Sequence, residues 1–397
     1  MTMSSSGEIR LRVFGRTDVG QIREHNEDNF LVADLTRRSR SLMESDREQI
    51  VGERGTVLGV CDGMGGAAAG EVASQLAVDI IYERLADNGP PADHNELARR
   101  LVEAVEEAGI RIFNEARADR TRRGMGTTAT VAALMDSRLF VAQVGDSRAY
   151  ILRNGRLVQV SRDQSLVNQL IEAGQLTEEE AETFEHNNII LQALGTAETV
   201  QVDLTYVDLR RGDVLMLCSD GLSGMIRSDE IREVLTTIKD PLEACRELTE
   251  RANRAGGHDN ITVIIGVFDG PGLPPPEDDA EPTYQKYPLP ESPSGHSPRA
   301  VAASGEATSY AAVGGAQQES EPRGLRVGHT VMGLASPVAA GLAVTDDADT
   351  TRPPPGPAHH SDEPVDLPTN GMAPSLVGIM VVGAMVLVAV AGILLLR

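Results

Sequence analysis

The prolines of this 397-residue chain are concentrated in its last third. Eighteen of the 21 prolines follow Phe268, in runs such as 274–276 and 353–355. Proline fixes φ and lacks a backbone N–H, so such runs are excluded from helix interiors and central strands. A packed core therefore has to come from residues before about 270. Residues 270–374, which are also rich in Ser, Gly, Ala and acidic side chains, are predicted to form a disordered linker.

An unbroken apolar run of 21 residues, 376–396, follows the predicted linker. About 20 apolar residues span the hydrocarbon core of a bilayer as a helix, so 375–397 is predicted to be a transmembrane helix. Arg397 behind the run and the acidic flank before it weakly favour an outside location for the large N-terminal part. The polar, charged first ten residues carry no export signal. We expect a single-pass protein of the cell membrane with its N-terminal domain in the cytoplasm.

The charge and the cysteine content argue against some classes of function. The formal net charge of −23 argues against nucleic-acid binding, since phosphate backbones would be repelled. Cys61, Cys218 and Cys245 have no metal-ligand spacing and fit a reducing compartment. The first two lie in apolar runs and are interpreted as buried small residues.

The first 270 residues combine short β-rich runs with helical stretches. The β-rich runs do not alternate regularly with helices, and segments such as 139–152 resemble hairpins. Both features favour antiparallel sheets covered by helices over a doubly wound parallel sheet. The predicted fold class is therefore α+β. Strands are predicted at 56–61, 128–135, 139–144, 213–218 and 261–268, and helices at 70–86, 95–116 and 241–254.

Carboxylates recur where predicted core strands begin or end. Each position adjoins a Gly, Asn or Ser that suits a turn. A single aspartate at a strand end is ordinarily a turn residue, but five such places would gather ionised groups that repel one another and resist desolvation. A bound divalent cation removes that cost, and all-oxygen ligands favour Mg²⁺ or Mn²⁺ over zinc or copper. The residues are Glu27 and Asp28 (HNEDNFLV), Asp62 (VLGVCDG), Asp146 (FVAQVGDSR), Asp220 (VLMLCSDG) and Asp259 (HDNITVI).

Neighbouring residues add to this hypothesis. Gly63 and Gly66 leave the backbone open, so that a carbonyl can approach a metal. Arg23, four residues before Glu27, could bind a phosphoryl group in bidentate fashion. The sequence has no HCxxxxxR loop of a cysteine phosphatase, no Walker A loop, no GxSxG elbow and no zinc-type histidine spacing.

With these residues assembled, the chain closely resembles the bacterial type of the PPM or protein phosphatase 2C family. Eight segments carry the resemblance in order between Thr17 and Phe268: TDVGQIREHNEDNF, VCDGMGG, GMGTTAT, QVGDSRAY, DQSLVNQLIEAGQL, LQALG, CSDGL and HDNITVI. The resemblance implies a phosphatase domain over 8–269, built as a four-layer α-β-β-α sandwich with two antiparallel sheets flanked by helices. It also implies a flap over about 166–189 beside the cleft.

The resemblance implies a role for each carboxylate. Asp62 would bridge two Mn²⁺ or Mg²⁺ ions and Gly63 would offer its carbonyl. Asp220 and Asp259 would hold one ion, and Glu27 and Asp28 the other, partly through water. Asp146 with Asp220 would form a weaker third metal site, and Arg23 would bind the substrate phosphate. Arg23, Asp62, Asp220 and Asp259 are thus the expected catalytic residues.

The implied activity is direct hydrolysis of phosphoserine and phosphothreonine in proteins by metal-activated water. Many eukaryotic members have a proposed general-acid histidine where this chain has Met64, as many bacterial relatives do, so the general acid is unassigned. The expected partners are phosphorylated proteins, including a serine/threonine kinase at the same membrane and its substrates in bacterial signalling. Two alternatives stay open: an inactive family member acting as a membrane-bound interaction module, and a phosphatase acting on an anti-sigma-antagonist type of regulator.

Overall fold

A computed structural model describes residues 7–40, 47–65, 69–181, 184 and 188–289. The predicted linker beyond 289 and the apolar run 376–396 lie outside these residues, as does Gly66. Among the helices that are described, none combines the length and apolar character needed to cross a bilayer.

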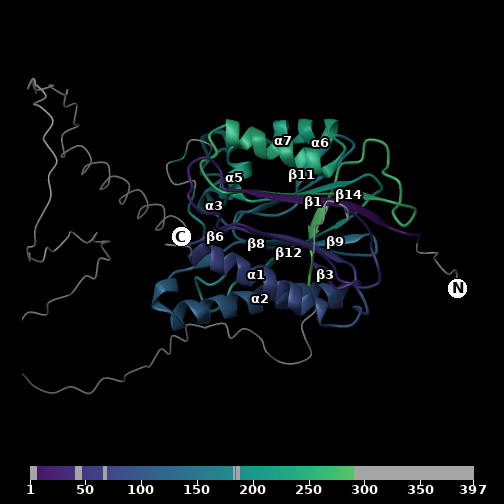
Figure 1. Cartoon of the computed structure of the whole chain (residues 1–397). Coiled ribbons are helices and arrows are strands. Elements are labelled where there is room, and N and C mark those ends of the chain that lie inside the picture. Colours follow the sequence, from purple (N-terminus) through teal and green to yellow (C-terminus); the bar gives the residue numbers. More distant parts are fainter. Residues whose placement is uncertain (1–6, 41–46, 66–68, 182–183, 185–187, 290–397) are drawn as a thin grey trace, which may run out of the picture. The chain divides into compact units, whose positions relative to one another are not determined.

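Two antiparallel sheets form the centre of the domain (Figure 1). The described part of the first sheet has six strands in the order β11 (Arg156–Gln159), β10 (Arg148–Arg153), β13 (Val214–Cys218), β14 (Ile261–Asp269), β1 (Arg10–Asp18) and β4 (Glu48–Ile50). The described part of the second has seven, in the order β15 (Tyr284–Lys286), β12 (Asp203–Asp208), β9 (Arg138–Val144), β8 (Ala129–Met135), β5 (Thr56–Cys61), β2 (Asn29–Asp34) and β3 (Ser39–Arg40). A short ribbon pairs β6 (Gly63–Met64) with β7 (Gly126–Thr127).

Helices cover the outer face of each sheet, as Figure 1 shows. The first sheet carries α6 (Ser228–Thr237) and α7 (Pro241–Arg254), and the second carries α1 (Ala69–Ala86) and α2 (His94–Ala118). The predicted α-β-β-α sandwich is confirmed. The remaining helices are short: the 3-10 turn η1 (Arg120–Arg122), α3 (Leu166–Glu172), α4 (Glu178–Ala181) and α5 (Asp220–Ser223).

Strand alternation explains why the central strands are apolar throughout. Successive side chains of a strand point to opposite faces of the sheet. On β13, Leu215 and Leu217 enter the core between the sheets, whereas Met216 and Cys218 enter the core under α6 and α7. Because both faces are covered, period-two polarity is lost, and the sequence shows a continuous apolar run. All three cysteines are buried and free, which confirms the burial predicted for Cys61 and Cys218.

The helix ends follow local capping chemistry. The carboxylate of Asp240 accepts hydrogen bonds from the backbone N–H groups of Leu242 and Glu243, and Pro241 occupies the first turn of α7. Thr177 and Glu180 exchange reciprocal hydrogen bonds at the start of α4 and so form a capping box. The predicted helix at 241–254 has the observed bounds of α7.

The first residues of the range predicted to be a linker pack on the domain instead. Strand β15 pairs with β12, with Lys286 opposite Thr205. Leu273 is buried, and the Tyr287 ring makes edge contacts with Phe140 at 5.0 Å and Tyr206 at 5.5 Å between ring centroids. Prolines are tolerated beside a short strand at a sheet edge, so the proline pattern alone could not locate the end of the ordered domain.

Tyr287 therefore contributes to the stability of the domain from outside the range 8–269. We expect Tyr287→Ala to lower the free energy of unfolding by about 1–3 kcal/mol, because it removes half-buried aromatic contacts and the hydrogen bond to Asn95. Urea unfolding of the full chain, followed by circular dichroism, measures this. Tyr284→Ala, at an exposed position of β15 three residues earlier, is the matched control, with an expected change within about 0.5 kcal/mol. An equal loss of unfolding free energy in both variants would contradict the stabilising role of Tyr287.

Candidate metal centre

The two sheets bring the predicted carboxylates to one end of the sandwich. Asp62 directly follows β5, Asp220 follows β13 through Ser219, and Asp28 directly precedes β2. The carboxyl groups of Asp62 and Asp220 come from different sheets, yet they lie close enough for each to shift the pKa of the other. Asp28 is buried and accepts a hydrogen bond from Ser219 Oγ at 2.8 Å. Strand ends that are far apart in sequence thus meet at one acidic cluster.

Burial raises the pKa of four carboxyl groups at this end of the sandwich. The pKa of Asp28 rises to about 7 through desolvation and then through the negative charges of Asp220 and Asp259. The pKa of Asp146 also rises to about 7, through burial and then through Asp220 and Asp163. Desolvation likewise raises the pKa of Asp220, and it raises that of Asp62 well above its usual range. The cluster therefore resists ionisation unless a positive charge joins it.

Of the buried carboxylate oxygens that have no hydrogen-bond partner in the described part of the chain, three belong to this cluster: Oδ1 of Asp28, of Asp146 and of Asp220. Buried polar atoms are ordinarily paired, so three such atoms in one cluster require an explanation. As the described side chains stand, no three or more carboxylate, histidine or cysteine groups enclose a single point closely enough to form a complete ligand shell. Unpaired carboxylate oxygens are nevertheless the donors that hard divalent cations take in proteins, so the residues present fit such an ion.

The backbone at Asp62 is fixed by the threonines of the GMGTTAT segment. Thr128 Oγ1 accepts a hydrogen bond from Asp62 N–H at 2.9 Å, and Thr127 Oγ1 donates to the Asp62 carbonyl at 2.8 Å. Thr128 N–H donates to the same carbonyl at 2.9 Å. Three hydrogen bonds thus hold the peptide groups on both sides of this aspartate. The GMGTTAT segment is one of those that carry the family resemblance, but its role in positioning Asp62 was not predicted from the sequence.

Two glycines let three backbone segments meet beside Asp62. A Cβ atom on Gly63 would lie 2.3 Å from the carbonyl oxygen of Gly70 and 2.4 Å from that of Glu27. A Cβ atom on Gly70 would lie 2.8 Å from the Glu27 carboxyl group. All three distances are far below van der Waals contact, so neither position has room for a side chain. Gly70 was not predicted as a site residue, because only the folded chain brings α1 against Gly63.

The loop 19–27 is held in place by Asn260, whose role was not predicted from the sequence. Its side-chain oxygen accepts from Glu27 N–H at 2.8 Å, and its nitrogen donates to the carbonyls of Val19 and His25 at 3.0 and 2.9 Å. The loop carries Arg23, whose Nη2 lies 2.7 Å from Asp259 Oδ2. Both side chains of that pair are partly exposed to solvent, which leaves the guanidinium accessible.

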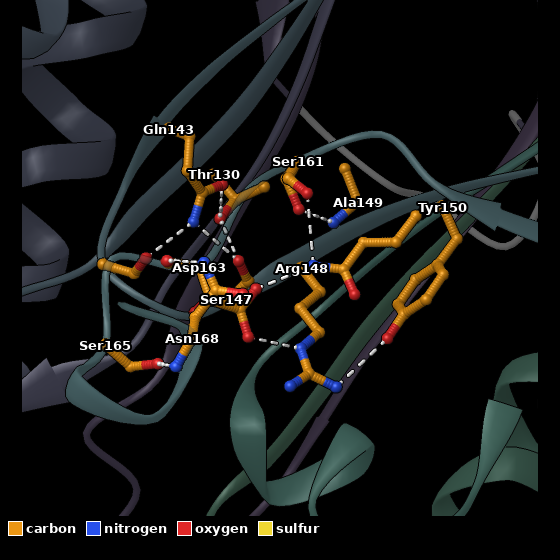
Figure 2. Close-up of polar contacts among 12 residues, drawn as sticks. Thr130, Gln143, Ser147, Arg148, Ala149, Tyr150, Ser161, Asp163, Ser165 and Asn168 are labelled. Carbon is orange, nitrogen blue, oxygen red and sulfur yellow. Dashed lines mark hydrogen bonds and ion pairs between the residues drawn. The ribbon is translucent and has the colours of Figure 1, made fainter. Parts of the chain in front are cut away.

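Asp146 lies in a tight loop supported by a buried polar network, which Figure 2 shows in part. Gln143 donates to the carbonyls of Gly145 and Ser147, and Thr130 donates to Gln143 and to Ser147. Beside it, Arg148 Nε donates to Asp163 Oδ2 at 2.8 Å. These contacts fix the backbone on both sides of Asp146 while its own Oδ1 stays without a partner.

The predicted flap, 166–189, leaves and rejoins the domain at one place. Leu166 N–H donates to the Ile189 carbonyl at 2.9 Å, and Ser165 forms a bridge with Ile190. The described part of the segment contains α3 and α4. Residues 182–183 and 185–187 lie outside the described residues.

Comparison with known proteins agrees with this architecture. The family model of protein phosphatase 2C matches residues 36–255. The serine/threonine phosphatase stp of Listeria innocua is 36% identical over 250 residues, which are 63% of this chain and 93% of that protein. The serine/threonine protein phosphatase PstP of Mycobacterium tuberculosis is 38% identical over 229 residues, which are 58% of this chain and 43% of that protein. The chain belongs to the protein phosphatase 2C family, as its resemblance implied.

Solved structures of similar proteins support the same fold. The crystal structure of the M. tuberculosis phosphatase PstP has a TM-score of 0.56 at 34% identity and covers 66% of this chain and 99% of its own. A structure of the PstP catalytic domain in complex with two manganese ions has a TM-score of 0.55 at 34% identity, with the same two coverages.

The raised pKa values predict how pH acts on the metal-free protein. Asp28 and Asp146 have folded-state pKa values of about 7, against about 3.9 when unfolded. The folded state therefore binds more protons between these values, so the stability of the metal-free protein falls as pH rises from about 4 to 7. Divalent ions replace those protons, so added Mn²⁺ should raise the Tm most at the upper end of this range.

Thermal unfolding of the full chain by circular dichroism, with EDTA and with Mn²⁺ at several pH values, measures this effect. Asp28→Asn should flatten the pH dependence because it removes one titrating group and keeps an oxygen for Ser219 Oγ. Asp208→Asn, at a strand end away from the cluster, is the control. If the Tm of the metal-free protein did not change with pH, and added Mn²⁺ did not raise it, the buried carboxyl groups would not lower the stability of the folded state.

Proposed function

We propose that this chain is a metal-dependent protein serine/threonine phosphatase that hydrolyses phosphoserine and phosphothreonine in proteins. The observation that carries the proposal is the cluster of buried carboxyl groups with raised pKa values and three unpaired oxygens. Family membership and the names of the relatives support the reaction class, and the two manganese ions in the PstP structure support divalent metal dependence.

The assignment of individual ligands is part of this proposal. Asp62 would lie between two Mn²⁺ or Mg²⁺ ions, with the Gly63 carbonyl beside it. Asp220 and Asp259 would hold one ion, Glu27 and Asp28 the other, and Asp146 with Asp220 a weaker third. When bound, the ions supply Lewis acidity that lowers the pKa of water and neutralises phosphate charge.

The chain's own side chains position the substrate. Arg23 is partly exposed at the rim of the cluster, and its contact with Asp259 orients the guanidinium. A planar guanidinium binds two phosphoryl oxygens at once, which suits it to hold the phosphate in line for attack by water. The exposed thioether of Met64 cannot donate a proton to the departing alkoxide. The leaving group has to be protonated from another source, and the general acid is unassigned.

The activity is tested on a phosphothreonine peptide with the full-length protein, with Mn²⁺ and with EDTA. We expect turnover with Mn²⁺ only, and a loss of about 100-fold or more in kcat for Asp62→Asn and Asp220→Asn. Arg23→Ala should raise KM about tenfold, because it removes a contact to the phosphate. Asp208→Asn should leave both constants unchanged. Folded protein that binds Mn²⁺ without turnover would favour the inactive interaction module.

We further propose that the apolar run 376–396 anchors the protein in the cell membrane with the phosphatase domain in the cytoplasm. Its length and lack of charge support this. A tether raises the local concentration of substrates at the same surface. The proposed substrates are therefore a membrane serine/threonine kinase and the proteins it phosphorylates, in bacterial signalling.

Fractionation of cells tests the anchor. The full-length chain should sediment with membranes, and a variant lacking residues 376–397 should be found in the soluble fraction. The phosphoproteome of cells with the shortened variant should gain phosphorylation on membrane proteins first. Equal distribution of both forms, or an unaltered phosphoproteome, would contradict the anchor or its role respectively.

A further inference from the structure

Asp203, the first residue of β12, lies where three separate parts of the chain meet. Its Oδ2 accepts a hydrogen bond from Gln164 Nε2 at 3.2 Å and lies 3.8 Å from Arg162 Nη1. Its Oδ1 lies 3.7 Å from Lys286 Nζ, which belongs to β15. The carboxyl group is only 16% exposed and forms part of the wall of a polar pocket of about 250 Å³. None of the eight segments that carry the family resemblance contains this residue.

The hydrogen bond to Gln164 connects Asp203 to the loop of Asp146. Gln164 is buried, and its Oε1 accepts from Gly145 N–H at 3.0 Å, while Gln164 N–H donates to the Gly145 carbonyl at 2.8 Å. Gly145 has φ +98°, a conformation reserved for glycine, and directly precedes Asp146. The amide side chain of Gln164 thus joins Asp203 at one end to the backbone beside the metal centre at the other.

The orientation of that amide depends on its acceptors. If the Gln164 amide were reversed, its nitrogen would face Gly145 N–H and both donors would be opposed. Three oxygens hold Nε2 in the observed direction: the carbonyls of Gln201 and Gln143, at 3.2 and 3.4 Å, and the carboxylate of Asp203, at 3.2 Å. The carboxylate is the side-chain acceptor among these three, so a substitution can remove it while the two backbone carbonyls stay in place.

The ion pairs of Asp203 with Arg162 and Lys286 contribute less to the local structure than its hydrogen bond with Gln164. Arg162 is half exposed and is also paired with Glu172 at the end of α3, and Lys286 is largely exposed. Ion pairs at such positions are screened by water and contribute little. The partly buried hydrogen bond from Gln164 is therefore the contact through which Asp203 acts.

We propose that Asp203 is a positioning residue for the metal centre: it orients the Gln164 amide, which fixes Gly145 and thereby Asp146. The proposal deepens the proposed phosphatase function and rests on it. It assigns Asp203 no contact with substrate or metal. Loss of the carboxylate oxygen loosens the Asp146 loop, whereas loss of its charge alone does not.

The test compares Asp203→Ala with Asp203→Asn in the full chain. The carboxamide of Asn keeps an oxygen for Gln164 Nε2 and removes the charge seen by Arg162 and Lys286. Asp208→Ala is the matched control, since Asp208 ends the same strand and its carboxylate is paired with Arg138 at 2.8 Å, away from the pocket. The first readout is hydrogen exchange of the peptide that contains Gly145, measured by mass spectrometry on the metal-free protein. The second is the Mn²⁺ concentration that gives half-maximal turnover of a phosphothreonine peptide.

We expect Asp203→Ala to speed exchange at Gly145 and to raise the half-maximal Mn²⁺ concentration about tenfold, with Asp203→Asn and Asp208→Ala close to wild type. Unchanged exchange in Asp203→Ala would overturn the proposal. Equal defects in the Ala and Asn variants would also overturn it, because the ion pairs would then be the effective contact. Hydrogen exchange does not require catalysis, so it gives its result even if the wild-type protein shows no turnover and the proposed function fails.

Discussion

The mutual repulsion of carboxyl groups with little access to water is the constraint on which this structure depends. The strand ends of two sheets deliver Asp28, Asp62 and Asp220 to one place, and desolvation there disfavours their charged forms. The surrounding hydroxyl and amide groups hold the backbone in position while leaving several acidic oxygens without partners. The domain thus keeps a locally unfavourable cluster through the rigidity of two packed sheets, and a divalent cation is the group that would relieve it.

The sequence located the acidic cluster because its signal is local. A carboxylate beside a small turn residue, next to an apolar run of strand length, can be recognised without knowing which strands are neighbours. The five predicted central strands have counterparts within one or two residues, since their buried faces make them continuously apolar. Which carboxylate faces which was supplied by the family resemblance, because it depends on the order of strands in the sheets. Periodicity contains no information on that order.

Other parts of the site could not be predicted, because their roles arise only in the folded chain. Asn260 holds a loop more than 230 residues away in sequence, and Gly70 lacks a side chain because α1 approaches Gly63. Neither residue belongs to a local pattern that indicates such a task. The same holds for Asp203, which looks like an ordinary polar residue at the start of a strand. The proline content led to a wrong boundary, because the predicted linker began at residue 270 although residues up to 289 pack on the domain.

The pairing of β15 with β12 has a consequence for how the domain can be handled and divided. Without residues 271–289, β12 would become the edge of the second sheet, with a row of free N–H and C=O groups, and the Tyr206 ring would lose its contact with Tyr287. Open strand edges of this kind are templates for association between copies of a chain. A catalytic fragment cut at the end of β14 would therefore be prone to aggregation, while one that extends to residue 289 carries its own protective edge.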